Sequence, residues 1–115
     1  MPESILKTKS YLFAIRIVKL YKFLTSEKKE YVLSKQVLRS GTSIGALIRE
    51  AEFGQSRADF TNKMSIALKE ANETDYWLNL LKDTNYLSEN MFQNISQDCL
   101  ELIKLLVATV KTTKK

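Results

Sequence analysis

Acidic side chains and one cysteine are the groups in this sequence that could support catalysis. Glu50, Glu70 and Glu73 could face inward from a helical bundle, like the carboxylates that hold paired metal ions in such folds. Those sites also use histidine, and the sequence contains none. We therefore expect no metal and no cofactor, and we assign the three acids to ion pairs with Arg39 and other basic side chains. An all-carboxylate magnesium enzyme is the least favoured alternative.

Nucleophilic catalysis has equally little support. Without histidine there can be no Ser-His or Cys-His pair. Cys99 lies on an apolar helical seam with Phe92, Ile95, Leu102 and Leu106, where a free cysteine is usually a small core residue. The sequence also lacks a GxxxxGK phosphate loop. We therefore predict that the protein is not an enzyme.

Basic residues are concentrated in the first third of the chain. The 115-residue sequence has a net charge of +5, and residues 1–39 contain nine Lys or Arg against three Glu. Such side chains can contact phosphates through charge-assisted hydrogen bonds and counterion release. The candidate nucleic-acid contacts are Lys9, Arg16, Lys19, Lys22, Lys28, Lys29, Lys35 and Arg39. The alternative is a solvated basic face that keeps a small bundle in solution.

Four helices must position these residues. Three glycines and one proline are too few for the turns of an all-β fold. Start and stop signals place helices at about residues 4–24, 30–52, 57–85 and 89–111, within a single domain over residues 1–115. Because the connections are short, sequential helices should be neighbours. The prediction is an all-α, antiparallel up-down-up-down four-helix bundle.

Two serines mark the starts of the third and fourth predicted helices. Ser56 precedes Asp59 by three residues, which is close to a capping box. Ser88 is the second predicted N-cap, between the staple residues Leu87 and Phe92. The third helix then has a seam of four-three spacing. Its members are Phe60, Met64, Ala67, Ala71, Thr74, Leu78 and Leu81.

Gly41 and Gly45 lie four residues apart, on one face of the second predicted helix. Each glycine inside a helix costs around 0.8 to 1 kcal/mol relative to alanine. Close packing of another helix against this face is the expected compensation. A backbone platform for a phosphate or another ligand is the alternative.

Apolar residues on the first, third and fourth predicted helices exceed what one core stripe needs. Beside the seam of the third helix lies a second row that mixes acids with apolar bulk and includes Ile66 and Trp77. We predict that these two side chains contact another subunit. The surplus apolar surface thus favours a homo-oligomer.

Several motifs are familiar: RSGTSIGA at residues 39–46, QSRADF at 55–60, and SIALKEANET with YWL at 65–74 and 76–78. Through them the chain resembles, over nearly its whole length, the four-helix-bundle family encoded in intervening sequences of bacterial large-subunit ribosomal RNA genes. Related proteins are the accessory variability determinants of diversity-generating retroelements. The resemblance implies a bacterial protein, a cyclic homopentamer and a link to nucleic acid. Leu47 and Arg49 depart from the ANIEEA that relatives commonly carry at residues 46–51.

Taken together, these features predict a non-enzymatic, oligomeric interaction protein that binds RNA or DNA non-specifically through basic surface residues. The alternative is a protein-binding scaffold that docks a partner such as a reverse transcriptase, by analogy with the retroelement cousins. A single cysteine and the absence of a signal-peptide pattern favour the cytoplasm. No apolar run approaches the roughly 20 residues of a membrane span, so we expect no membrane association.

Overall fold

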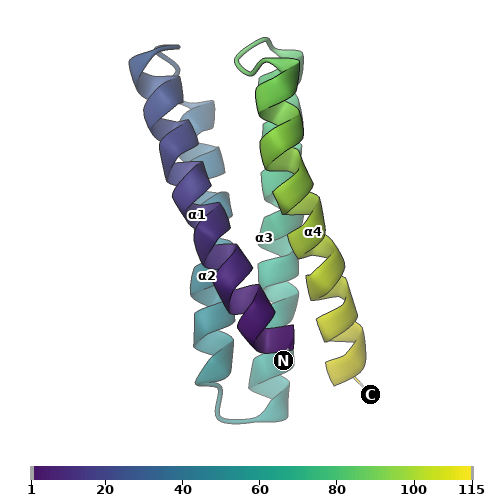
Figure 1. The fold of residues 1–115 in the computed structure, drawn as a ribbon. Coiled ribbons are helices and arrows are strands. Elements are labelled where there is room, and N and C mark those ends of the chain that lie inside the picture. Colours follow the sequence, from purple (N-terminus) through teal and green to yellow (C-terminus); the bar gives the residue numbers. More distant parts are fainter. Residues whose placement is uncertain (1, 115) are drawn as a thin grey trace.

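The protein forms four antiparallel helices in the computed structural model, which describes the backbone of residues 2–114 and the side chains of residues 5–114. The helices are α1 (Pro2–Ser26), α2 (Leu33–Glu52), α3 (Arg57–Asp83) and α4 (Glu89–Thr113). Each helix runs opposite to the one before it, in a bundle that measures 44 × 20 × 19 Å (Figure 1). The predicted all-α four-helix bundle is therefore confirmed.

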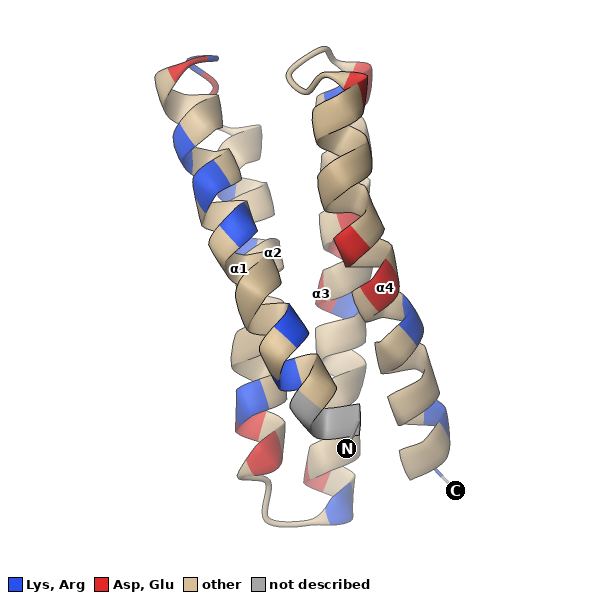
Figure 2. Cartoon of the chain, viewed as in Figure 1, with Lys and Arg blue, Asp and Glu red and all other residues tan. Residues whose placement is uncertain are grey.

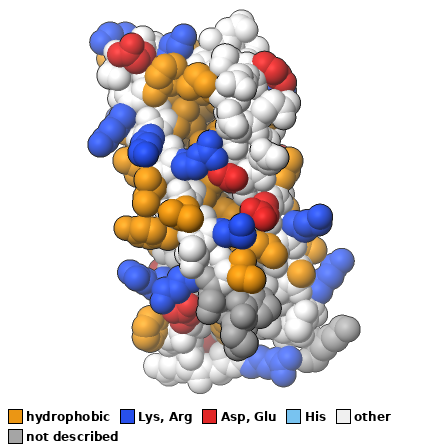
Figure 3. Space-filling model, viewed as in Figure 1, with side chains coloured by type: hydrophobic (Ala, Val, Ile, Leu, Met, Phe, Trp, Pro, Cys, Tyr) orange, Lys and Arg blue, Asp and Glu red, His pale blue; other side chains and the backbone are white. Residues whose placement is uncertain are grey.

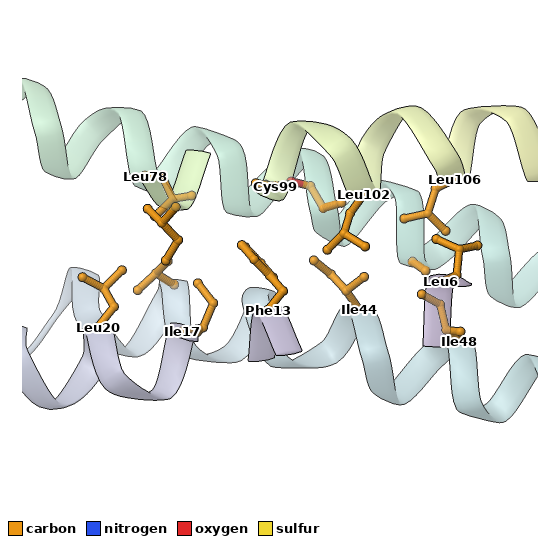
Figure 4. Close-up of a cluster of buried hydrophobic side chains, with 14 of the residues drawn as sticks. Leu6, Phe13, Ile17, Leu20, Ile44, Ile48, Leu78, Cys99, Leu102 and Leu106 are labelled. Atoms are coloured by element: carbon orange, nitrogen blue, oxygen red, sulfur yellow. Dashed lines mark hydrogen bonds between the residues drawn. The ribbon is translucent and has the colours of Figure 1, made fainter. Parts of the chain in front are cut away.

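A continuous apolar core runs along the bundle axis (Figure 4). Phe13 enters it from α1 and lies beside Ile44 of α2 and Leu102 of α4. Leu6 lies further along the axis, beside Ile48 and Leu106. The predicted seam of α4 is buried throughout. The predicted seam of α3 is buried except at its first residue, which is half-buried because it lies in the exposed first turn.

Helix α2 packs closely on both sides. A Cβ atom at Gly41 would lie 2.7 Å from Ile17 Cγ1, and one at Gly45 would lie 3.3 Å from Ser10 Oγ. The absence of side chains at these two positions thus lets α1 approach the backbone of α2. On the other side, Thr74 Oγ1 of α3 donates a hydrogen bond to Ser40 Oγ at 3.0 Å inside the core.

The first residues of the predicted second helix form a cap instead of a helical turn. The prediction began this helix at residue 30, but α2 begins at Leu33. The carboxylate of Glu30 accepts hydrogen bonds from the backbone N–H groups of Val32, Leu33 and Ser34, at 3.2, 3.0 and 2.7 Å. The preceding Lys29 has a positive φ of 53°, which turns the chain between α1 and α2. An acid thus caps the helix from outside it.

The other helix ends follow local signals. Ser56 accepts a hydrogen bond from Asp59 N–H and Ser88 accepts one from Met91 N–H, so both predicted caps are confirmed. Helix α3 ends at residue 83 instead of the predicted 85, because Asn85 takes a positive φ of 69°. The N–H groups of residues 85 and 86 donate to the carbonyls of residues 82 and 81, which is a Schellman motif. Helix α1 extends two residues beyond the prediction at each end, and α4 ends two residues later than predicted.

Candidate nucleic-acid interface

Two of the predicted phosphate contacts on α1 form ion pairs with α4. Lys9 Nζ lies 3.2 Å from Glu101 Oε1, and Arg16 pairs with Asp98. Arg16 Nη1 also donates to the backbone carbonyl of Asn94 at 3.2 Å. The positive charges of Lys9 and Arg16 are therefore partly neutralised by acids of α4, and these ion pairs link α1 to α4. The predicted stripe along α1 is not uniformly available to an external anion.

Arg39 also forms ion pairs, in this case with acids of α3. It pairs with Glu70 at 3.1 Å and with Glu73, as the sequence predicts for these acids. A hydrogen bond from Trp77 Nε1, at 3.0 Å, and the contact with Arg39 hold the pKa of Glu73 below its usual value. The hydrogen bond with Glu73 in turn raises the pKa of Arg39. Glu50, the third acid considered for a metal site, pairs with Lys63 at 3.0 Å.

The remaining five predicted contacts are exposed lysines at one end of the bundle. Among the residues that the structure describes, none of the five forms an ion pair. We call this group the lysine cluster: Lys19, Lys22, Lys28, Lys29 and Lys35. It covers the end of α1, the α1–α2 connection and the first turn of α2. Figure 2 shows basic residues along the C-terminal half of α1. On this part of the chain, acidic residues appear only near the connection between α1 and α2.

The acids near the lysine cluster differ in accessibility. Glu27 is exposed to solvent. Glu30 is only 8% exposed, and its carboxylate accepts hydrogen bonds from the N–H groups at the start of α2. Burial alone would raise the pKa of Glu30, but the hydrogen bonds from residues 33, 34 and 32 outweigh it and lower the pKa. A free helix N-terminus is a ready-made anion site. Here that site is already filled, so an external phosphate would meet lysine side chains instead.

An exposed aromatic residue at the same end was missed in the sequence. Tyr31 is 53% exposed and lies between Lys29 and Lys35 along the chain. The sequence placed this residue inside the second predicted helix, so no sequence signal marked it as exposed. An aromatic ring beside lysines can stack on a nucleobase while the lysines contact phosphates.

Ile66 and Trp77, the predicted subunit contacts on α3, are both partly buried by their own chain. Trp77 is half-buried, packs against the chain's own core and donates to Glu73. Ile66 is half-buried as well. Four more exposed apolar side chains lie together on α1, where we define an α1 apolar face. It consists of Tyr11, Leu12, Ile15 and Val18. Beside this face, a surface groove of about 630 Å³ runs between α1 and α2 and is lined in part by Gly45.

The groups considered for catalysis are placed as core and ion-pair residues. Cys99 is buried, and its thiol donates to the backbone carbonyl of Ala71 at 3.5 Å. Burial, with the nearby charges of Asp75 and Asp98, raises the pKa of Cys99 to about 12. In the described part of the chain, no three His, Cys, Asp or Glu side chains gather closely enough to hold a metal ion. Over the same residues, no helix has the length and apolar character needed to cross a membrane.

The fold and the motifs agree with one protein family. Residues 3–108 match the family described as 23S rRNA-intervening sequence protein. The chain belongs to this family. Its fold also matches the crystal structure of a protein of unknown function from the S23 ribosomal protein family of Bacteroides thetaiotaomicron VPI-5482. The TM-score is 0.95 at 59% sequence identity, covering 96% of this chain and 99% of that chain. No curated protein matches the sequence.

Leu47 and Arg49, the two departures from the expected motif, occupy different environments on α2. Leu47 is half-buried and packs against the core, so it adds apolar contact on α2. Arg49 is exposed and lines the groove between α1 and α2 together with Lys7. Leu47 therefore contributes to packing, and Arg49 contributes positive charge to a surface groove.

Proposed function

We propose that this member of the 23S rRNA-intervening sequence protein family is a non-enzymatic, cytoplasmic homo-oligomer that binds RNA or DNA through the lysine cluster. The observation that carries the proposal is the exposure of five lysines at one end of the bundle that form no ion pair with any described residue. The other three predicted cations pair with acids. Contact of such lysines with phosphates releases counterions and requires no particular base sequence. The family's description also links its members to an intervening sequence of 23S rRNA.

Single-stranded nucleic acid is the form that this end of the bundle favours. Each lysine carries a point charge on a flexible stem, so the cluster can adapt to the irregular phosphate spacing of a single strand. The exposed Tyr31 adds a surface on which one base could stack. We expect Tyr31→Ala to weaken binding to a single strand more than binding to a duplex of the same length.

A salt-dependent anisotropy titration with a labelled single-stranded RNA tests the lysine cluster. In the double variant Lys28→Glu/Lys29→Glu, affinity at low salt should fall about tenfold or more, and the slope of log affinity against log salt should fall by about two. The matched control is Lys104→Glu/Lys111→Glu, which makes the same charge change at exposed positions on α4. Equal losses in both variants, or no binding by the unaltered protein at low salt, would refute the proposal.

The α1 apolar face supports the oligomeric part of the proposal. Tyr11 and Leu12 are 66% and 55% exposed, and they adjoin the groove between α1 and α2. A second copy that covers this face would remove apolar surface from water. A ring of five chains is the assembly we propose, from the family resemblance. Light scattering should give five times the 13.2 kDa chain mass, and Leu12→Glu should lower it. A monomeric unaltered protein would contradict this.

A further inference from the structure

A separate groove lies between the second half of α1 and the first half of α4. Its volume is about 360 Å³. Leu20, Leu87 and Ile95, all nearly buried, form its floor, and the half-buried Phe23 and Met91 form its walls. Of the neighbouring helix pairs, α1 and α4 pack least closely, and they diverge toward this end of the bundle (Figure 1). Figure 3 shows the apolar side chains that are left uncovered between them.

The rim of this groove is cationic on one side and neutral on the other. Arg16 and Lys19 line it from α1, and Asn94 lines it from α4. None of the described residues that line it is acidic. Asp98 lies one turn beyond Asn94 and is already paired with Arg16. Lys19 is exposed and has no ion pair within the described residues, so its charge is available to an occupant.

We propose that this groove docks an acidic amphipathic helix of a partner protein. Apolar side chains of that helix would contact Phe23 and Met91, and its carboxylates would meet Lys19. The lining residues of α1 extend from residue 16 to residue 23, about 10 Å along the axis at 1.5 Å per residue. That length matches two turns of a docked helix, which usually presents anchors at positions i, i+3 or i+4, and i+7.

The apolar floor distinguishes this groove from the lysine cluster. Phosphates and riboses gain little from contact with Leu20, Phe23 and Met91, whereas leucine or phenylalanine side chains of a helix would be removed from water there. Only Lys19 belongs to both surfaces. The two proposals can therefore be tested with different substitutions, and either can fail without the other.

The probe is a fluorescein-labelled synthetic helix of about 16 residues, with leucines at i, i+3 and i+7 and flanking glutamates. A second peptide carries lysines in place of the glutamates. The unaltered protein should bind the acidic peptide and not the basic one. Met91→Glu places a carboxylate in the groove wall and should weaken binding about tenfold or more. The matched control Leu100→Glu alters an exposed leucine of α4 outside the groove and should leave affinity unchanged.

A charge reversal at the rim provides an independent variant that leaves the groove wall intact. Lys19→Glu should weaken binding of the acidic peptide and strengthen binding of the basic peptide. RNA affinity of Met91→Glu should equal that of the unaltered protein, which separates this site from the lysine cluster. Equal binding of both peptides, or full affinity in Met91→Glu, would overturn the proposal. So would a lower oligomer mass for Met91→Glu in light scattering, because a second copy would then be the occupant.

Discussion

The two flanks of α2 and the seam between α1 and α4 show different ways for helices to meet. At the flanks of α2 the contacts are close: Gly41 receives the side chain of Ile17, and Ser40 is hydrogen-bonded to Thr74. At the other seam, the ion pairs made by Arg16 and Lys9 bridge α1 and α4, and a groove remains toward one end.

Side-chain size at the contact explains this difference. A glycine lets a neighbouring backbone approach, so Ile17 fills the space over Gly41 and is fully buried. Phe23 and Met91 are bulky and only half-buried, and they leave apolar surface uncovered between α1 and α4. Resistance to unfolding should therefore concentrate where α2 packs closely on its neighbours, and the seam between α1 and α4 should open at a lower free energy. Three substitutions test this contrast.

The largest effect is expected at Gly41. In Gly41→Ala the new Cβ would lie 2.7 to 2.9 Å from three atoms of Ile17, a fully buried side chain. Overpacking of this kind costs about 1 to 3 kcal/mol. Because the contacts are so short, we expect a cost near the upper end, which exceeds the gain of about 1 kcal/mol in helix propensity. We expect a net loss of about 1 to 2 kcal/mol in the free energy of unfolding, measured by urea denaturation.

Gly45→Ala is the matched control for this substitution. Its Cβ would lie 3.3 Å from Ser10 Oγ and 3.4 Å from the backbone carbonyl of Ser10, so a shift of a few tenths of an ångström accommodates it. The helix-propensity gain should nearly offset that strain, and the free energy of unfolding should change by less than about 1 kcal/mol. A loss in Gly45→Ala as large as that in Gly41→Ala would contradict the assigned difference between the two glycines.

The cap of α2 predicts a pH-dependent effect of intermediate size. The pKa of Glu30 is lowered in the folded state, so its stabilisation is present at neutral pH and disappears as the pH falls through the folded-state pKa. Glu30→Gln should lower the free energy of unfolding at pH 7 by about 0.5 to 1 kcal/mol, because the amide oxygen of Gln can still accept one of the hydrogen bonds. The difference from the unaltered protein should shrink on acidification. The exposed Glu27→Gln serves as a control and should show little change at either pH.

The smallest effect is expected at the open seam. Arg16 and Asp98 have side chains that are 40% and 42% exposed, so water and salt screen their ion pair. Asp98→Asn should lower the free energy of unfolding by about 0.5 kcal/mol or less at low salt, and by still less at about 1 M salt. Denaturation at the two salt concentrations checks this. An effect as large as that of Gly41→Ala would mean that the seam between α1 and α4 is as cohesive as the flanks of α2.

The predicted helices and their caps depended on local interactions, which explains why they could be read from the sequence. Ser56 and Ser88 bond to N–H groups three residues away, and the seams of α3 and α4 repeat within each helix. The start of α2 was predicted three residues early, because Glu30 reads equally well as a first-turn residue and as a cap. Its conformation depends on the turn at Lys29, which leaves no periodic signal.

The candidate interface could be predicted only in part. The sequence shows eight basic residues near its start, but nothing in it separates the lysine cluster from Lys9, Arg16 and Arg39. The acids that pair with these three residues lie on α3 and α4, far away in the sequence. Tyr31 was missed for a related reason, since the exposure of a residue in a turn depends on how the flanking helices pack.

The sequence by itself determined the four helices, their antiparallel order, the main buried seams and the family. Tertiary structure alone decided which cations remain available, that the N-terminus of α2 is closed by Glu30, and that a groove lies between α1 and α4. The physical reason is the range of the interactions. Helix periodicity and capping act over three to four residues along the chain, whereas ion pairs and grooves arise where distant helices meet, and their positions follow from packing.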